Sequence, residues 1–442
     1  MGRALQTDLY ELNMASSYLR RGMTAPATFS LFIRNLPEGW GFLVACGLGR
    51  CLEYLEGFEF TDEDLTYLRT EHGYPEETLE AFSSLRFTGS VRAMPEGRVV
   101  FPHEPLLEVT APLPEAQLAE SYLLNQVTYQ TAVASKAARC RLAAPDAAIV
   151  DFSFRRVHGA EAGLGVARAT AIAGFSATSN VEAARTLGLR ATGTMAHSYV
   201  EAFPTEIDAF RAFAEDFPDR VILLVDTYDT TGGVENAIEV ARELQGRGKA
   251  LSGIRLDSGD LAALAFEARR ALDAAGLQDV QILASGGLDE HEIARLVAQG
   301  APIDAYGVGT KVGVAEDAPA PDSVYKLVKY GDEPVCKLSA GKATLPGPKQ
   351  VWRTPEGDVI GRAEEEGPEL GEPLMVEVMR EGRRLDDGSI AAAAERFAAD
   401  AKALPEGVRS LRPDRYPVSR TNALDMLSHQ VAERIRTREH LP

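Results

Sequence analysis

The chain has 442 residues, with 46 Lys and Arg against 65 Asp and Glu, which gives a formal net charge of −19. This length exceeds what a single hydrophobic core usually supports, so about two to three domains are expected. The acidic balance argues against general affinity for nucleic acid or for an anionic membrane, and an anionic substrate would need a local basic pocket.

Hydrophobic residues make up 45% of the chain and charged residues 25%, which is ordinary for a soluble globular enzyme. No apolar run approaches the roughly 20 residues that cross a bilayer, and the start, MGRALQTDLYELNM, has acidic residues where a signal peptide has an apolar core. We therefore expect a cytoplasmic protein. The dispersed Cys46, Cys51, Cys140 and Cys336 predict reduced thiols rather than a disulfide framework or a zinc site.

The first hundred or so residues predict an antiparallel α+β region. A helix is expected over about 8–21, followed by strands at 27–36 and 41–48 and a strand-rich stretch at 89–109 that prolines interrupt. From Pro114 a long helical run leads into the next region.

Between Ala147 and Gly313, strand-like apolar runs alternate with amphipathic, Ala-rich helical stretches. The runs are AAIVDFSFRR, ATGTMAHS, VILLVDTYDT, LSGIRLDSGD, QILASGG and IDAYGVGT. About six or seven such strands predict an irregular or incomplete α/β barrel. A doubly wound open sheet is the alternative, but the G-x-G-x-x-G fingerprint expected after its first strand is missing. In either case the chemistry is expected at the carboxyl ends of the strands.

The Pro-rich stretch EDAPAPDS, at 316–323, predicts a boundary. Beyond it, SVYKLVKY, PVCKLS and KQVWR are expected to be strands, and a charged helix closes the chain. The predicted domains are 1–113, 114–323 and 324–442.

Two of the strand ends carry chemistry that suits a charged substrate. His197 follows a predicted short strand and Thr194, with the next clear helix expected only after Pro204, and an imidazole there can titrate near neutral pH. The alternative is a histidine without chemistry. Arg255 and Asp257 point to one face of their strand, where they could bind an anion and sugar hydroxyls. The alternative is a helix N-cap supplied by Asp257 or Ser258.

Glycine turns at the ends of consecutive strands predict a cradle for one phosphate group, since their backbone N–H groups can approach an anion without obstruction. The cradle comprises Gly286, Gly287, Gly307, Gly309 and Thr310. In DFSFRR, an aromatic ring and a guanidinium could hold a planar aromatic acid together if the chain turns at Phe154. The alternative is a core strand with a solvated arginine pair.

Taken together, these motifs resemble nicotinate phosphoribosyltransferase over nearly the whole chain. The resemblance rests on TDLYELNM, FIRNLP, DFSFRRVHG, FSATSN, GTMAHS, VDTYDT, IRLDSGDL, ASGG, GVGTKVG and KLSAGKATLPGPKQVWR. It implies a type II phosphoribosyltransferase fold, that is, an irregular TIM-like α/β barrel flanked by an α+β domain built from both chain ends. It also implies a homodimer with shared active sites.

The resemblance also implies roles for individual residues. His197 matches the histidine that ATP phosphorylates during turnover. Tyr10, from the partner subunit, and Phe152 match rings that sandwich the pyridine. The remaining substrate positions are Arg155, Ser179, Thr194, Arg255, Asp257, Ser258, Gly259 and the phosphate cradle, and Arg34, Lys337 and Lys349 are candidates for pyrophosphate.

The implied reaction joins nicotinate to phosphoribosyl pyrophosphate with loss of pyrophosphate, in NAD biosynthesis. Mg²⁺ and the local arginines and lysines would neutralise the leaving group, and ATP is an expected co-substrate. The metal ligands are not predicted.

Three other functions compete with this one. Nicotinamide phosphoribosyltransferase shares the motifs, but its relatives carry an aspartate where this chain has Ser179, and an aspartate would repel a carboxylate. Quinolinate phosphoribosyltransferase belongs to a shorter family that decarboxylates its substrate without ATP. A non-catalytic sugar-phosphate sensor on the same fold would not need His197.

Overall fold

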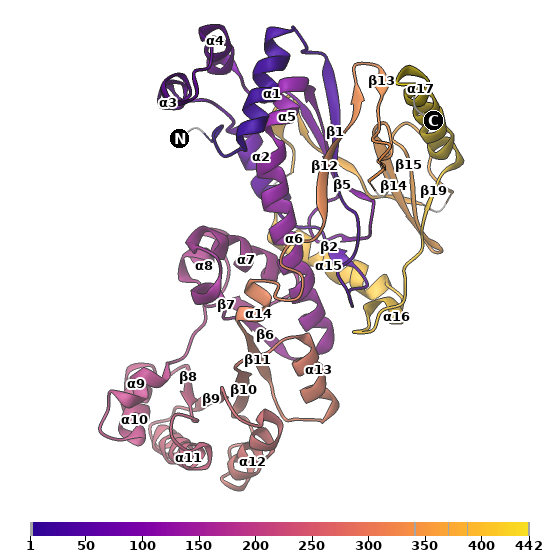
Figure 1. The fold of residues 1–442 in the computed structure, drawn as a ribbon. Coiled ribbons are helices and arrows are strands. Elements are labelled where there is room, and N and C mark those ends of the chain that lie inside the picture. Colours follow the sequence, from indigo (N-terminus) through magenta and orange to yellow (C-terminus); the bar gives the residue numbers. More distant parts are fainter. Residues whose placement is uncertain (1–2, 340–341, 370, 387, 441–442) are drawn as a thin grey trace. The chain divides into compact units, whose positions relative to one another are not determined.

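The computed structural model describes residues 3–339, 342–369, 371–386 and 388–440, so Ala340 and Gly341 of the late lysine-containing motif lie outside the described residues. The chain divides into two compact units, the first formed by Met1–Ala132 with Ala320–Pro442 and the second by Val133–Pro319 (Figure 1). The first division falls inside helix α6, Glu120–Ala143, rather than at the predicted 113/114. The second falls within EDAPAPDS.

A six-stranded parallel sheet with the order β7-β6-β11-β10-β9-β8 is the centre of the second unit. Its strands are β6 (Ala148–Asp151), β7 (Ala177–Thr178), β8 (Val221–Leu224), β9 (Leu251–Leu256), β10 (Gln281–Ser285) and β11 (Ala305–Val308). Every pair in it is parallel. The α/β prediction is thereby confirmed, in the form of a half-barrel.

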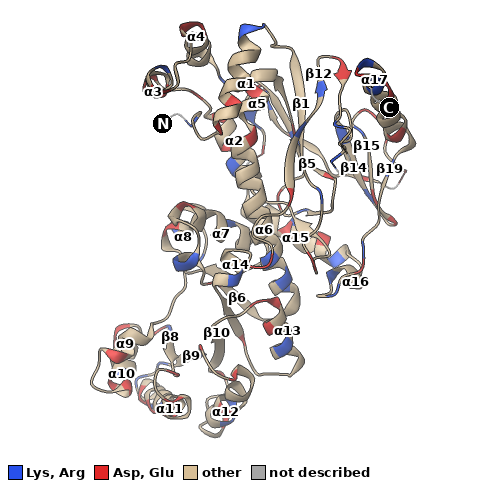
Figure 2. Ribbon diagram, viewed as in Figure 1, with Lys and Arg blue, Asp and Glu red and all other residues tan. Residues whose placement is uncertain are grey.

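Helices follow these strands, and Figure 2 shows that they carry many of the unit's charged residues. They are η1 (Phe154–Arg156), α7 (Ala160–Ile172), α8 (Val181–Leu187), α9 (His197–Glu201), α10 (Glu206–Asp216), α11 (Thr230–Gly246), α12 (Leu261–Ala274), α13 (Glu290–Ala298) and α14 (Thr310–Gly313). Polar N-cap residues begin several of these helices. The side chains of Asp229, Asp260 and Asp289 accept hydrogen bonds from backbone N–H groups in the first turns of α11, α12 and α13, respectively. Each cap satisfies an N–H group that the first turn leaves open.

One local prediction for this unit is wrong, and so is one of the alternatives. Residues 191–198 form no strand; only a single bridge joins Ala191 to Thr178, and helix α9 already begins at His197. The N-cap of α12 is Asp260 rather than Asp257 or Ser258. The side chain of Asp257 is instead hydrogen-bonded by Ser285, and that of Ser258 donates to Asp226.

The first unit combines elements from both chain ends, as predicted. Its largest sheet has the order β13-β12-β1-β5-β3-β17-β18, and β1 lies between β12 from the later part of the chain and β5 from the earlier part. The strands of this sheet are β13 (Glu333–Pro334), β12 (Ser323–Tyr330), β1 (Pro26–Ile33), β5 (Pro105–Pro112), β3 (Ser90–Ala93), β17 (Val376–Arg380) and β18 (Arg383–Arg384). Antiparallel pairing of β1 with β5 and β12 buries seven of its eight residues.

Two smaller sheets and eight further helices complete the described part of the first unit. The sheets are β16-β14-β15-β19 and β2-β4, with β2 (Leu43–Val44), β4 (Val99–Val100), β14 (Lys349–Thr354), β15 (Gly357–Arg362), β16 (Glu372–Pro373) and β19 (Val418–Arg420). The helices are α1 (Leu9–Arg20), α2 (Leu48–Glu56), α3 (Asp62–His72), α4 (Glu76–Ser84), α5 (Leu113–Leu118), α15 (Ile390–Ala403), α16 (Glu406–Arg409) and α17 (Asn422–Arg438). The predicted strand at PVCKLS is wrong, since only Glu333–Pro334 pairs there. Among the described residues, no helix has the length and apolar character to span a membrane.

Candidate active site

A cavity of about 440 Å³ lies at the carboxyl ends of the parallel strands in the second unit. Residues from several of the predicted motifs line it together: Phe152, Phe154, Arg155, Arg156, Ser179, Gly193, Thr194, Met195, Ala196, Arg255, Asp257, Ser285, Gly286, Gly287, Leu288, Gly307, Gly309, Thr310 and Lys311. Parallel strands bring their carboxyl ends to one edge, so distant motifs converge there.

Arg255 is the main cation on the wall of this cavity. Its side chain is 13% exposed, Nη1 donates to Thr194 Oγ1 at 2.6 Å, and Nε is buried without a hydrogen-bond partner. Burial lowers the pKa of the guanidinium, and the Asp257 and Asp226 carboxylates oppose that effect. Arg255 Nη2 also lies 3.8 Å from Asp257 Oδ1. A largely buried cation that still has an unused N–H group can accept a further anion, which makes Arg255 a ready partner for a carboxylate.

An aromatic ring lies beside this guanidinium. The Cζ atom of Arg255 is 5.9 Å from the centre of the Phe152 ring. Strand β6 ends at Asp151 and the chain turns into η1, so that Phe152, Phe154, Arg155 and Arg156 all reach the cavity. The interpretation of DFSFRR as a core strand is therefore wrong, whereas both arginines are exposed as that interpretation expected. Arg156 is a lining residue that the sequence analysis missed.

Asp257 connects three parts of the site. Ser285 Oγ donates to its Oδ1 at 2.5 Å, its backbone N–H donates to Asp226 Oδ2 at 2.9 Å, and His197 Nε2 lies 3.8 Å from its Oδ2. The other ring nitrogen of His197 lies 3.3 Å from Thr227 Oγ1. His197 is 39% exposed and stands next to the cavity rather than in its wall.

Asp226 and Thr227 are further residues that the sequence analysis did not single out. Both belong to VDTYDT, which follows β8. Their position after a parallel strand could have marked them as site residues. Asp226 also accepts from Ser258 Oγ at 2.7 Å, while its Oδ1 is buried without a partner. Ser258 and Gly259 line a neighbouring hollow that Asp257 shares, so these two predicted residues lie beside the main cavity.

Two glycines of these turns, Gly286 and Gly307, approach neighbouring groups so closely that a side chain would not fit. Gly286 has φ +92°, and a Cβ atom there would lie 1.9 Å from the carbonyl oxygen of Asp257. A Cβ atom on Gly307 would lie 2.5 Å from the Phe152 ring.

Next to this turn, Lys311 lines the cavity and its Nζ is 2.7 Å from Asp289 Oδ2. Lys311 is another missed residue, and its position directly after GVGT was the signal.

Replacing Gly286 should destabilise the second unit far more than replacing its neighbour. In Gly286→Ala the methyl group meets a backbone oxygen in addition to the left-handed strain, and we expect a loss of about 3 kcal/mol or more in the free energy of unfolding. Gly287 has φ +64° with nothing within 4 Å of a Cβ atom, so Gly287→Ala should cost only about 1 kcal/mol. Urea unfolding followed by circular dichroism tests this, and equal losses would contradict the close approach.

The remaining predicted residues belong to the first unit. Tyr10 is 48% exposed on α1. Arg34 and Lys337 line a second cavity in that unit. Lys349 is buried at 3% exposure, with its Nζ 3.0 Å from Glu108 Oε1 and 2.7 Å from the carbonyl oxygen of Gly347. The ammonium group of Lys349 is therefore already paired within the protein, which argues against the predicted role in binding pyrophosphate.

Comparison with known proteins identifies the family. Residues 5–128 match the nicotinate phosphoribosyltransferase N-terminal domain and residues 147–317 match the nicotinate phosphoribosyltransferase family. The chain is 46% identical to nicotinate phosphoribosyltransferase pncB2 of Mycobacterium tuberculosis over 93% of this chain and 90% of that protein. It is 47% identical to the nicotinate phosphoribosyltransferase of Bacillus subtilis over 82% and 77% of the two chains.

A solved structure agrees with these matches. The crystal structure of human nicotinic acid phosphoribosyltransferase superposes with a TM-score of 0.87 at 29% identity and covers 96% of this chain and 99% of that chain. Both halves of the sequence and the whole fold thus point to the same group of proteins, and the chain belongs to the nicotinate phosphoribosyltransferase family.

Proposed function

We propose that this protein is a nicotinate phosphoribosyltransferase, which forms nicotinate mononucleotide and pyrophosphate from nicotinate and phosphoribosyl pyrophosphate. The observation that carries the proposal is the largely buried Arg255, whose Nε lacks a hydrogen-bond partner and whose guanidinium lies 5.9 Å from the Phe152 ring. A cation beside an aromatic ring suits a flat pyridine that bears a carboxylate.

In the proposed binding mode, different residues of the cavity lining hold the pyridine, the ribose and the phosphate. Nicotinate would lie against Phe152, with its carboxylate toward Arg255, Thr194 and Arg155. Ser179 adds no negative charge on that side. Asp257 would accept hydrogen bonds from the ribose hydroxyls, and the turns at Gly286, Gly287, Gly307, Gly309 and Thr310 would hold the 5′-phosphate.

In the reaction, the nicotinate ring nitrogen donates its electron pair to the anomeric carbon while the bond to the pyrophosphate oxygen breaks. This displacement needs alignment of the two reactants and neutralisation of the leaving group more than it needs a general base. Arg34 and Lys337, from the first unit, are the basic side chains we propose for pyrophosphate; the partners of Lys349 remove it from this set.

Mg²⁺ fits the residues at the strand ends. No group of three or more His, Cys, Asp or Glu that could hold a metal occurs among the described residues, and Mg²⁺ commonly uses one or two carboxylates together with substrate phosphates. Asp226, with a buried Oδ1 that lacks a partner, and Asp257 would hold it. When bound, the ion would neutralise charge on the departing pyrophosphate.

His197 is the proposed site of phosphorylation by ATP. Its imidazole is 39% exposed, and Thr227 and Asp257 flank its two nitrogens. A transferable phosphoryl group on this ring would couple ATP hydrolysis to product formation. ADP would leave when the imidazole nitrogen attacks the γ-phosphorus, and water would later release phosphate.

The activity can be tested with the purified chain. Incubation with nicotinate and phosphoribosyl pyrophosphate should release pyrophosphate and form nicotinate mononucleotide in equal amounts. Binding of the sugar phosphate without turnover would support a sensor instead.

We further propose a homodimer in which Tyr10 completes the neighbouring subunit's site. Mixing inactive Tyr10→Ala and Asp257→Ala chains should then restore activity, because a mixed dimer contains one site with both wild-type residues. Random reassociation makes half of the dimers mixed, so about a quarter of the wild-type rate should return. No recovery after demonstrated subunit exchange would mean that each site is built from one chain.

A further inference from the structure

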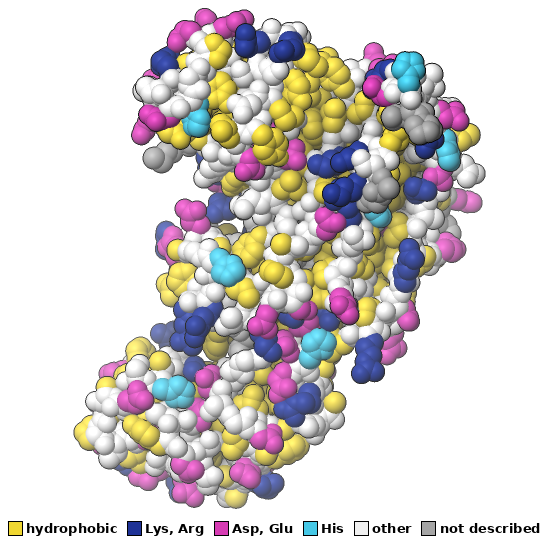
Figure 3. All heavy atoms as spheres, in the orientation of Figure 1, with side chains coloured by type: hydrophobic (Ala, Val, Ile, Leu, Met, Phe, Trp, Pro, Cys, Tyr) yellow, Lys and Arg dark blue, Asp and Glu magenta, His cyan; other side chains and the backbone are white. Residues whose placement is uncertain are grey.

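The first turn of helix α1 carries two neighbouring residues with contrasting surroundings. Tyr10 is 48% exposed, whereas the side chain of the next residue, Glu11, is fully buried. Figure 3 shows hydrophobic side chains gathered around the positions of α1 and α5 on this face of the first unit. A carboxylate that water cannot reach is costly unless it is paired or protonated, so the partners of Glu11 decide its charge.

One amide connects Glu11 to a second carboxyl group. Gln117 Nε2, on α5, donates to Glu11 Oε2 at 2.6 Å and to Glu120 Oε2, on α6, at 3.1 Å. Glu11 also forms a hydrogen bond with Glu120, and Oε1 of Glu11 is buried without a donor. Two carboxylates can only accept, so a hydrogen bond between them requires a proton on one of the two. The arrangement therefore fits a pair that shares one proton.

Little positive charge balances this pair. Lys326 Nζ, on β12, lies 3.8 Å from Glu120 Oε1, and no Lys or Arg among the described residues forms an ion pair with Glu11. From α4, which also packs on α1, the contact is a neutral hydroxyl pair, Ser16 with Thr78 at 3.0 Å. The other titratable groups around the pair are acids and phenols, namely Asp8, Tyr10 and Tyr18 near or on α1, Tyr54 on α2 and Tyr325 on β12.

These surroundings place the loss of the shared proton near neutral pH. Burial raises the pKa of Glu11 to about 7, and its hydrogen bonds with Tyr10 and Gln117 oppose that rise. Burial also raises the pKa of Glu120, against the charge of Lys326. When the proton leaves, two like charges remain in one buried site, and their repulsion weakens the contact between Glu11 and Glu120.

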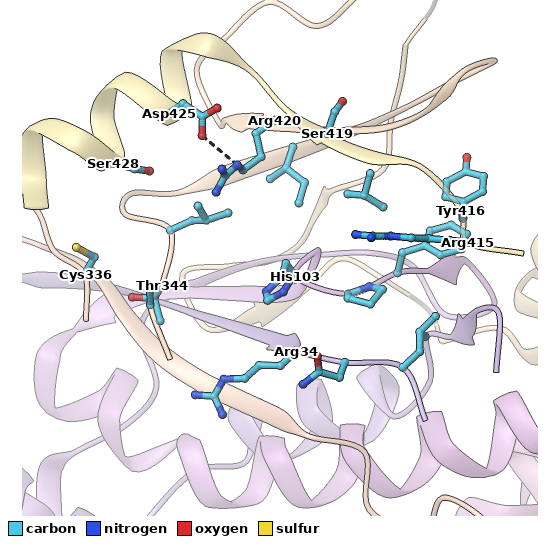
Figure 4. A pocket seen from close by; sticks show the side chains of 18 of the residues that line it. Arg34, His103, Cys336, Thr344, Arg415, Tyr416, Ser419, Arg420, Asp425 and Ser428 are labelled. Carbon is cyan, nitrogen blue, oxygen red and sulfur yellow. Dashed lines mark ion pairs between the residues drawn. The ribbon is translucent and has the colours of Figure 1, made fainter. Parts of the chain in front are cut away.

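Tyr10 is connected to this pair through its hydroxyl. Burial raises the pKa of that hydroxyl, and a hydrogen bond with Glu11 and the charge of Glu120 raise it further. The ring and the Glu11 carboxyl also stand on one helical turn, so a displacement of that turn moves both. The pair does not line the basic cavity of Figure 4, where Arg34 and Arg420 lie, so changing it leaves the residues proposed for pyrophosphate in place.

We propose that Glu11 is a positioning residue for Tyr10, and that the proton it shares with Glu120 holds the Tyr10 ring in the orientation that packs against nicotinate. This role rests on the proposed function, which assigns Tyr10 to the neighbouring subunit's site. It adds a protonated carboxyl pair, remote from the reacting atoms, to what that site requires. Nicotinate should therefore bind less tightly as the pH rises from about 6 to about 8, although its own carboxylate is ionised at both values.

The pH dependence of KM for nicotinate, with saturating phosphoribosyl pyrophosphate and ATP, tests this role. In the wild type KM should be about 2- to 10-fold higher at about pH 8 than at about pH 6, which is the range that one aromatic contact supplies. Glu11→Gln has an amide that is neutral at both pH values and can donate to Glu120, so it should keep the lower KM at both. Glu71→Gln, exposed on α3, is the matched control and should follow the wild type.

The complementation experiment described above separates this role from the shared site. Recovery of activity in the mixture of Tyr10→Ala and Asp257→Ala chains, together with a KM of Glu11→Gln that rises with pH as in the wild type, would overturn the role of Glu11 alone. No recovery would overturn the shared site and the effect of Glu11 on nicotinate with it.

Urea unfolding tests the shared proton without any measurement of activity. The folded-state pKa of Glu11 lies above its ordinary value of 4.5, so the contribution of this group to the free energy of unfolding falls as the pH rises from about 4.5 to about 7. Glu11→Gln lacks the group, and its unfolding midpoint should rise relative to that of the wild type over this interval, whereas Glu71→Gln should stay parallel to the wild type. Midpoints of Glu11→Gln that also stay parallel would contradict the shared proton.

Discussion

Arg255→Gln should lower kcat/KM for nicotinate by about 30-fold to several thousand-fold, which corresponds to roughly 2 to 5 kcal/mol for one buried charge pair. The glutamine keeps a polar N–H donor but supplies no charge for a carboxylate. In the wild type the guanidinium is 13% exposed and its Nε has no partner, so little water screens the lost interaction. Steady-state kinetics with varied nicotinate measures the effect.

Two further variants separate charge from structure. Arg255→Lys keeps the charge but not the planar fork, so it should recover part of the lost efficiency. Arg270→Gln removes an exposed charge from α12, outside the cavity lining, and should leave the kinetics unchanged. If Arg255→Gln lowered the efficiency with nicotinate and with nicotinamide equally, the guanidinium would not recognise the carboxylate.

His197→Ala should abolish the stimulation by ATP, so that the ratio of rates with and without ATP falls to about one, while a slow ATP-independent reaction remains. The bond to the anomeric carbon depends on charges placed by other side chains, whereas phosphoryl transfer needs the imidazole itself. Incorporation of labelled phosphate from γ-labelled ATP, measured beside product formation, checks both halves of this expectation.

His72→Ala is the control for this experiment, because His72 lies in the first unit against Tyr67. It should keep the full response to ATP. A His197→Ala protein that still hydrolyses ATP in step with product would assign the phosphoryl group to another residue.

The meeting of the motifs in one cavity was predictable from the sequence because it follows from a general property of parallel sheets. Phe152, Arg255 and Gly286 are separated by long stretches of chain, yet each lies at or directly after the end of a strand, and strand ends share one edge. The Gly residues were predictable for a similar reason, since close approach of the backbone requires them.

What could not be predicted depends on individual partners. Lys349 looked like a phosphate ligand, but it meets Glu108, which is 241 positions away in the sequence, and no local pattern reveals such a pair. Asp260 rather than Asp257 caps α12, because the side chain of Asp257 is hydrogen-bonded by Ser285 from the next strand. His197 begins a helix instead of following a strand, since residues 192–196 leave the sheet after one bridge.

The ratio of kcat/KM for nicotinate to that for nicotinamide, measured on the wild-type protein with phosphoribosyl pyrophosphate and ATP, tests the proposed function most directly. The ratio isolates the carboxylate, because the two substrates share the pyridine ring and differ in charge at one substituent. With Arg255 largely buried beside the Phe152 ring and Ser179 adding no negative charge, nicotinate should be favoured by about 30-fold to several thousand-fold. Comparable efficiency with both substrates would contradict the proposed recognition of the acid.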